Sequence, residues 1–244
     1  MRDSIRHFVA EFVGTFALVF VGAGAVMTNG GNQLAVAAAH GLILAIMVSA
    51  VGHISGAHFN PAVTFGFLIT GRIVPRLAGA YWVAQFLGAT LAALILNWIY
   101  PDQIAEAANL GAPALNDQIG VAPGFVLEVV MTFFLVWVVF ATAADPRGAF
   151  KSIAGFAIGL TIAADILLGG PLTGAAMNPA RAFGPQLVAG EWSDAWIWYV
   201  APLLGAGLAA VAYEFLYLRP VRPVPVGPPE TGIEEPRPGD AALS

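Results

Sequence analysis

The sequence predicts an all-α membrane protein with six transmembrane helices and two re-entrant half-helices, arranged as an inverted internal repeat. Three observations lead to this fold class. Of the 244 residues, 58% are hydrophobic and only 10% are charged, whereas about a quarter of a soluble domain is charged. Six apolar segments are long enough to cross a bilayer. The tripeptide Asn-Pro-Ala also occurs twice, each time at the start of a shorter apolar segment.

The composition excludes several classes of function. The chain has no cysteine, so it has neither disulfides nor thiolate chemistry. The net charge of -5 is dispersed, with no basic patch for nucleic acid. No metal-ligand cluster, nucleophile–base pair or phosphate-binding loop is evident. We therefore expect no enzyme activity, no metal and no cofactor.

The full spans follow from segment length, because the hydrocarbon core takes about 20 apolar residues per helix. The first segment is too long, and follows too weak a basic start, to be a cleaved signal peptide. The stretch 219–244 is rich in proline and charge and is expected to be a disordered tail. The six segments cover approximately residues 8–28, 35–55, 79–100, 122–144, 152–169 and 196–218.

The two half-helices are predicted at about 60–70 and 178–189. At about 1.5 Å per residue, about ten residues cross only half of the hydrocarbon core. Asn60 and Asn178 are favoured N-cap residues, and the proline that follows each suits a first helical turn, where no backbone N–H is needed. Each Asn-Pro-Ala motif therefore starts a helix inside the membrane.

Positive charges orient the spans. With six spans, the N-terminus, the connections after the second and fourth spans, and the C-terminus share one side, and every Lys and Arg except Arg181 lies there. By the positive-inside rule both termini are cytoplasmic. Arg181 is expected at membrane depth for a functional reason. The Lys and Arg residues of the chain are Arg2, Arg6, Arg72, Arg76, Arg147, Lys151, Arg181, Arg219, Arg222 and Arg237.

Two halves of the chain repeat each other. Glu11-x-x-x-Thr15-Phe16 recurs 117 residues later, starting at Glu128. "VAQFLGATLAA" from residue 83 recurs at the same offset as "VAPLLGAGLAA". The sequence thus predicts one repeat over 1–117 and another over 118–218. Each repeat has three spans, an odd number, so the second starts on the opposite side of the bilayer and the repeats are inverted.

Inversion brings the two half-helices together. They enter from opposite faces, so their N-termini meet near the middle of the membrane, each with roughly half a positive charge. Asn60 and Asn178 can offer side-chain N–H donors at that point. Non-helical backbone at this depth is tolerated only in protein or beside a water-filled cavity. This arrangement orients a polar molecule by its oxygen and repels cations, as a pore requires.

At this point the sequence resembles a known family. "SGAHFNPAVTFG" (residues 55–66), "MNPARAFGP" (residues 177–185) and the glutamates of the first and fourth spans are similar to those of the aquaporin, or major intrinsic protein, family. The resemblance implies the aquaporin-like hourglass fold, a passive water channel in each subunit and a homotetramer in the lipid bilayer. The pore motifs that it implies are Asn60, Pro61, Ala62, Asn178, Pro179 and Ala180.

The family's selectivity filter carries over by spacing from the motifs to His40, Ile166, Ala175 and Arg181. This set resembles that of plant tonoplast intrinsic proteins, as does "ATAADPRG" at residues 141–148. Ile166 offers no hydrogen bond and Ala175 leaves room. We expect water to pass, with ammonia, hydrogen peroxide or urea as further neutral solutes, while ions and protons are excluded. The outer loop contains no His, which counts against ammonia. We place the channel in the cell (plasma) membrane.

Two alternatives stay open. A glycerol facilitator of the family usually has Asp where this chain has Ala182, and carries filter aromatics that are missing here. A proton-coupled secondary transporter would use Glu11, Glu128 and Asp165 as proton carriers. We instead expect Glu11, Glu128 and His58 to brace the re-entrant loops. Asp165 could face a neighbouring helix or line the outer vestibule.

Overall fold

The computed structural model describes residues 2–29, 31–147 and 153–219. The described residues form helices and no strand, and six of the helices are long and apolar enough to cross a membrane. The predicted fold class is therefore confirmed, and the protein is a multi-pass membrane protein. The predicted tail at 219–244 lies outside the described residues apart from Arg219. The long helices are α1 (Arg2–Thr28), α2 (Gln33–Ser55), α4 (Pro75–Ile99), α6 (Val121–Val139), α7 (Ala154–Thr173) and α9 (Ile197–Tyr213).

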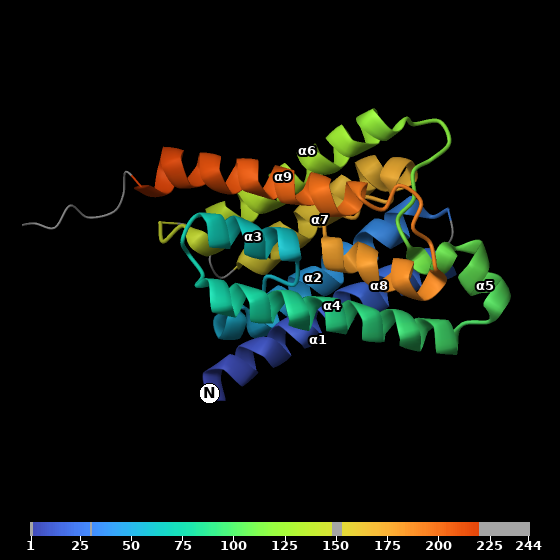
Figure 1. Ribbon diagram of the computed structural model, residues 1–244, viewed down its shortest axis with the longest axis horizontal. Helices are drawn as coiled ribbons and strands as arrows, with labels where there is room; N and C mark the ends of the chain where they lie inside the picture. The colour runs from blue at the N-terminus through green and yellow to red at the C-terminus, as the bar shows by residue number, and fades with distance from the viewer. Residues whose placement is uncertain (1, 30, 148–152, 220–244) are drawn as a thin grey trace, which may run out of the picture.

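Two shorter helices, α3 (Pro61–Ile69) and α8 (Pro179–Ala189), lie in the centre of the bundle (Figure 1). Each begins with the proline of an Asn-Pro-Ala motif. The preceding asparagine is extended and its side chain accepts hydrogen bonds from the first turn: Asn60 Oδ1 from Ala62 N at 2.8 Å, and Asn178 Oδ1 from Ala180 N at 3.0 Å. N-capping and proline geometry thus start both helices in an apolar interior.

The long helices pack in pairs around these two. The main contacts join α1 to α4, α6 to α9 and α2 to α7, and each short helix packs mainly on a long helix from the other half of the chain, α3 on α9 and α8 on α4. Close approach depends on glycine: a Cβ on Gly88 of α4 would overlap the backbone of α1, and one on Gly205 of α9 would overlap the backbone of α6. The N-terminus and the end of α9 lie at the same end of the bundle (Figure 1).

The structure differs from the expected segments in two places. The connection after α4 contains a short helix α5 (Asp102–Ala107) and a 3₁₀ turn η1 (Asn109–Gly111), where no element was predicted. The fifth span was expected to end near residue 169, but α7 continues through Pro171 to Thr173. Pro171 is the third-last residue of α7, so its missing N–H removes a single bond at the very end of the hydrogen-bond ladder.

Polar contacts fasten the bundle at the end where the N-terminus lies. The helices α6 and α9 close there in π-helical turns, η2 (Phe140–Ala144) and η4 (Glu214–Leu218). Arg72 Nη2, after α3, lies 2.7 Å from the buried Glu214 carboxylate. Asp145 accepts from Arg147 Nη2 at 2.7 Å, and the same nitrogen donates to the Tyr217 carbonyl at 3.0 Å. These contacts join the connections after α3 and α6 to the end of α9.

Replacing Asp145 with Asn is expected to lower stability in a pH-dependent way. Hydrogen bonding to Arg147 lowers the pKa of Asp145 from its ordinary 3.8 to about 2, so the carboxylate stabilises the folded state above pH 4 and loses that contribution as the pH falls towards 2. Arg147 is half exposed, so solvent screening keeps this contribution small. Thermal unfolding in detergent should show a melting temperature lower by about 2–4 °C for the variant at neutral pH. The difference from the parent should shrink as the pH falls from about 4 to about 2 and vanish below that, and a difference that does not shrink would contradict this account.

Candidate functional site

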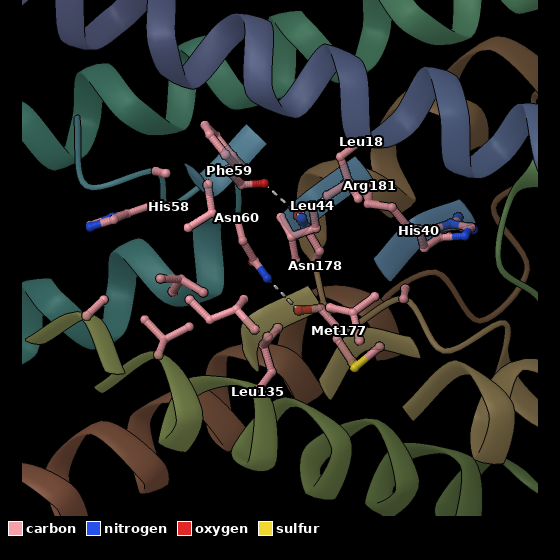
Figure 2. Close-up of a pocket in the computed structure, with 18 of the residues that line it drawn as sticks. Leu18, His40, Leu44, His58, Phe59, Asn60, Leu135, Met177, Asn178 and Arg181 are labelled. Atoms are coloured by element: carbon pink, nitrogen blue, oxygen red, sulfur yellow. Dashed lines mark hydrogen bonds between the residues drawn. The ribbon is translucent and has the colours of Figure 1, made fainter. Parts of the chain in front are cut away.

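The two Asn-Pro-Ala motifs meet at the centre of the molecule. Asn60 Nδ2 donates to the Met177 carbonyl at 2.8 Å, and Asn178 Nδ2 donates to the Phe59 carbonyl at 2.9 Å. Figure 2 shows these two bonds as dashed lines, with His58 on one side of the asparagines and His40 and Arg181 on the other. Each amide has a second N–H that these bonds do not use. The helix N-termini and the asparagine side chains are therefore brought to one spot.

The loops that lead into α3 and α8 have a strained backbone. Ala57 and Phe59 in the first loop, and Ala175 and Met177 in the second, all have positive φ, between 42° and 52°. Left-handed backbone is unfavourable for residues other than glycine and persists only where the surroundings hold it. The strain therefore requires a brace.

Two buried glutamates make the bracing contacts. Glu11 accepts from the backbone N–H of His58 at 2.9 Å and of Phe59 at 2.7 Å. Glu128 accepts from Ala176 N at 3.0 Å and from Met177 N at 2.8 Å. Both carboxylates are fully buried, so these charge-assisted bonds form without competing water.

Further polar groups complete each brace. Ser55 Oγ donates to Glu11 and Thr173 Oγ1 donates to Glu128, both at 2.7 Å. The carbonyl of Ser55 accepts from Tyr81 Oη at 2.6 Å, and that of Thr173 accepts from Trp198 Nε1 at 3.0 Å. His58 contacts Thr64 Oγ1 through Nδ1 at 3.0 Å, and its ring packs against that of Phe67 at an interplanar angle of 40°. Our reading of the sequence missed Ser55, Thr173, Tyr81 and Trp198, although the repeat offset would have pointed to both pairs.

A narrow cavity of about 30 Å³ runs past both motifs. Since a water molecule needs about 10–15 Å³ of such space, the cavity can hold a single file of very few waters. Wider cavities adjoin it at both ends. One of about 260 Å³ shares His40, Ile166 and Arg181 with it, and one of about 530 Å³ shares Val48, Gly56 and Ala143. Together they trace a path along the bundle, with the smallest cavity at its centre.

The walls of the central cavity differ in polarity. The side chains and backbone of the two loops, with His40 and Arg181, provide the polar wall. The other large lining side chains are apolar. A solute that passes therefore finds few hydrogen-bonding groups apart from these. The apolar residues are Leu18, Leu44, Val48, Val63, Leu135, Val139, Ile158, Ile162 and Ile166.

His40 and Arg181 lie together where the central cavity opens into the 260 Å³ cavity. His40 Nδ1 lies 2.9 Å from the Val36 carbonyl, which can only accept, so Nδ1 carries the proton and Nε2 is left as an acceptor. Arg181 Nη2 lies 3.5 Å from that Nε2, and Nη1 donates to the Gly111 carbonyl at 2.8 Å. Gly111 belongs to η1, and nothing in the sequence pointed to it as a partner of Arg181.

Ile166 and Ala175 line the same part of the path. Ile166 borders both the central and the outer cavity, and Ala175 borders the central one. Asp165 is buried beside Ile166, and its Oδ2 has no hydrogen-bond partner among the described residues. His40, Ile166, Ala175 and Arg181 thus all line the central cavity, while Asp165 lines none of the three cavities.

The family model for the major intrinsic proteins matches residues 1–213 of the chain. The chain belongs to this family. As a major intrinsic protein it is a membrane channel and not an enzyme.

Comparison with curated major intrinsic proteins gives plant relatives. The chain is 46% identical over 234 residues to "Probable aquaporin TIP-type alpha" of Phaseolus vulgaris, covering 91% of this chain and 89% of that one. It is 43% identical over 226 residues to "Aquaporin TIP4-4" of Zea mays, covering 88% of this chain and 87% of the relative. The aquaglyceroporin from Plasmodium falciparum has a similar structure, with a TM-score of 0.80 and 25% identity over 89% of this chain and 98% of that chain.

Proposed function

We propose that this protein is a passive channel for water and other small neutral solutes that excludes ions and protons. The observation that carries the proposal is the meeting of Asn60 and Asn178 at the midpoint of a path that narrows to a cavity of about 30 Å³. A water molecule there can accept from an asparagine N–H with its oxygen. Its own hydrogens then donate to the waters on either side, so its oxygen is not free to accept a proton from them, and proton transfer along the file is interrupted.

Electrostatics supports the exclusion of cations. The N-termini of α3 and α8 each carry roughly half a positive charge towards the centre. Arg181 adds a full charge at the filter, where water is scarce. A cation would lose hydration and meet only positive potential, whereas a neutral solute needs only hydrogen bonds.

We assign the filter to His40, Ile166, Ala175 and Arg181. Two of its members offer polar atoms, at His40 Nε2 and the Arg181 guanidinium, and two are apolar and of modest size. This composition suits ammonia, hydrogen peroxide and urea as solutes that pass with water. Glycerol is the alternative, since an aquaglyceroporin has a similar fold, but the filter offers no aromatic surface for a carbon chain.

Stopped-flow measurements on proteoliposomes test this function. Water permeability should exceed that of protein-free vesicles, should not saturate with the gradient and should need no ion gradient. Urea, ammonia and peroxide should pass more readily than glycerol. Saturable flux coupled to protons would favour the transporter, and glycerol flux equal to that of urea would favour the glycerol facilitator.

The double variant His40→Phe, Ile166→His is expected to restrict passage towards water alone, because a bulky ring and a second polar ring would narrow the filter. The ratio of urea to water permeability should fall by about tenfold or more, because placing a group that fits a pocket poorly costs about 1–3 kcal/mol. Ile153→Ala, at an exposed position before α7, is the matched control. An unchanged urea-to-water ratio would contradict the filter assignment.

We also propose an assembly and a membrane. The protein would be a homotetramer in the cell membrane, with both termini cytoplasmic and two inverted repeats over 1–117 and 118–218. Exposed apolar side chains on every long helix, such as Leu42, Leu94, Phe134 and Leu208, leave surface for lipid and neighbouring subunits. The matched contacts of Glu11 and Glu128 support the repeats. Native mass spectrometry of the detergent-solubilised protein should give the mass of four chains.

A further inference from the structure

The cavity outside the filter contains a polar side chain that the filter assignment does not use. Gln33 begins α2, two turns before His40, and lines the 260 Å³ cavity together with His40, Ile166 and Arg181. Its Nε2 donates to the Ile166 carbonyl. The bond joins α2 to α7 beside the outer opening of the filter.

The helix α7 is shaped to receive this amide. Gly170 lies one turn after Ile166, and a Cβ at that position would overlap the Gln33 side-chain amide. Glycine inside a helix is unfavourable relative to alanine. The three atoms nearest to such a Cβ all belong to the Gln33 amide group, so Gln33 fills the space that Gly170 leaves open.

The amide also keeps hydrogen-bonding capacity for a solute. A glutamine side chain has two N–H donors and an acceptor oxygen. The bond to Ile166 uses one donor, and neither the second donor nor Oε1 has a partner among the described residues. A polar group that lines a water-filled cavity with free capacity is able to contact what passes.

We propose that Gln33 is a fifth selectivity-determining residue of this channel. Its amide, docked on the Ile166 carbonyl in the space left by Gly170, narrows the outer opening and fixes the backbone that carries the apolar side of the filter. Without it the opening widens on the α7 side, and solutes larger than water gain most. This inference rests on the proposed channel function and deepens it by naming a determinant of solute size.

Four variants in proteoliposomes test the proposal: Gln33→Ala, Gly170→Ala, the double variant, and Leu34→Ala as the matched control. Leu34 is the next residue of α2 and is 67% exposed on the outer surface of the bundle. Gly170→Ala displaces only the end of a flexible side chain, so the fold is retained. The readout is the ratio of urea to water permeability, normalised to the amount of reconstituted protein.

We expect Gln33→Ala and Gly170→Ala each to raise this ratio by about fivefold, the change that corresponds to one hydrogen bond worth about 1 kcal/mol. The double variant should show no further increase, because both changes remove the same contact. Leu34→Ala should equal the parent. A ratio unchanged in Gln33→Ala, or additive effects in the double variant, would overturn the role of Gln33. Failure of the channel function would look different, since the parent itself would then conduct no more water than empty vesicles.

Discussion

Replacing Glu128 with Ala is expected to remove most of the water permeability by releasing the loop before α8. The change leaves the backbone N–H groups of Ala176 and Met177 and the Thr173 hydroxyl without their acceptor in a buried site. Unsatisfied buried donors are costly, and removing one partner of a buried charged contact costs about 3–5 kcal/mol. The variant also no longer has to bury a carboxylate, and the cost of about 3–5 kcal/mol already includes that gain.

Thermal unfolding followed by size-exclusion chromatography should place the melting temperature of this variant lower by about 10 °C or more. Glu128→Gln should give a smaller decrease, because it keeps the side-chain volume and one acceptor oxygen. Glu191→Ala, in the loop after α8, is the control and should match the parent. If Glu128→Ala melted and conducted like the parent, the loop would not depend on this carboxylate.

The second large effect is expected for Arg181→Val, which should make the channel leak cations. A unit charge about 4 Å from a passing cation raises its energy by about 4 kcal/mol at an effective dielectric constant of 20. Cation permeability should therefore rise by on the order of a hundredfold or more, while water permeability is retained or increased because the filter becomes wider. Proton flux into vesicles that contain a pH-sensitive dye measures the change.

Arg76→Ala is the matched control for charge, because Arg76 is exposed at the start of α4, far from the path. It should leave proton flux at the level of the parent. Arg181→Lys separates charge from shape: cation exclusion should persist, but the bond to the Gly111 carbonyl should weaken. Equal proton flux in Arg181→Val and the parent would contradict this role of Arg181 and would mean that the half-helices alone exclude cations.

The elements that the sequence predicted best are those set by local rules. Bilayer thickness sets the length of the spans, and asparagine followed by proline sets the start of α3 and α8, so both could be placed without coordinates. The repeat offset paired Glu11 with Glu128 for the same reason, since symmetry is visible in one sequence. The fifth span was placed short of the true end of α7 at Thr173, because the length of an apolar segment does not by itself locate a helix end.

Contacts that depend on distant segments could not be predicted. The Gly111 carbonyl reaches Arg181 only because η1 folds against the bundle, with Leu110 buried at positive φ. Gln33 and Ile166 are 133 residues apart in the chain and have no symmetry mate to reveal them. Asp165 illustrates the same limit. Whether it faces the path depends on how α7 is rotated about its own axis, and the sequence does not show this rotation because α7 is apolar on every side.

The exchange of short helices between the halves has a consequence for biosynthesis. Because α3 rests on α9, the first re-entrant segment lacks its main packing surface until the last helix has left the ribosome and entered the bilayer, whereas α8 rests on α4, which is made before it. A nascent chain that stops before Ile197 therefore has no finished conduit. Membrane integrity during translation is protected by the topology itself, without a separate plug.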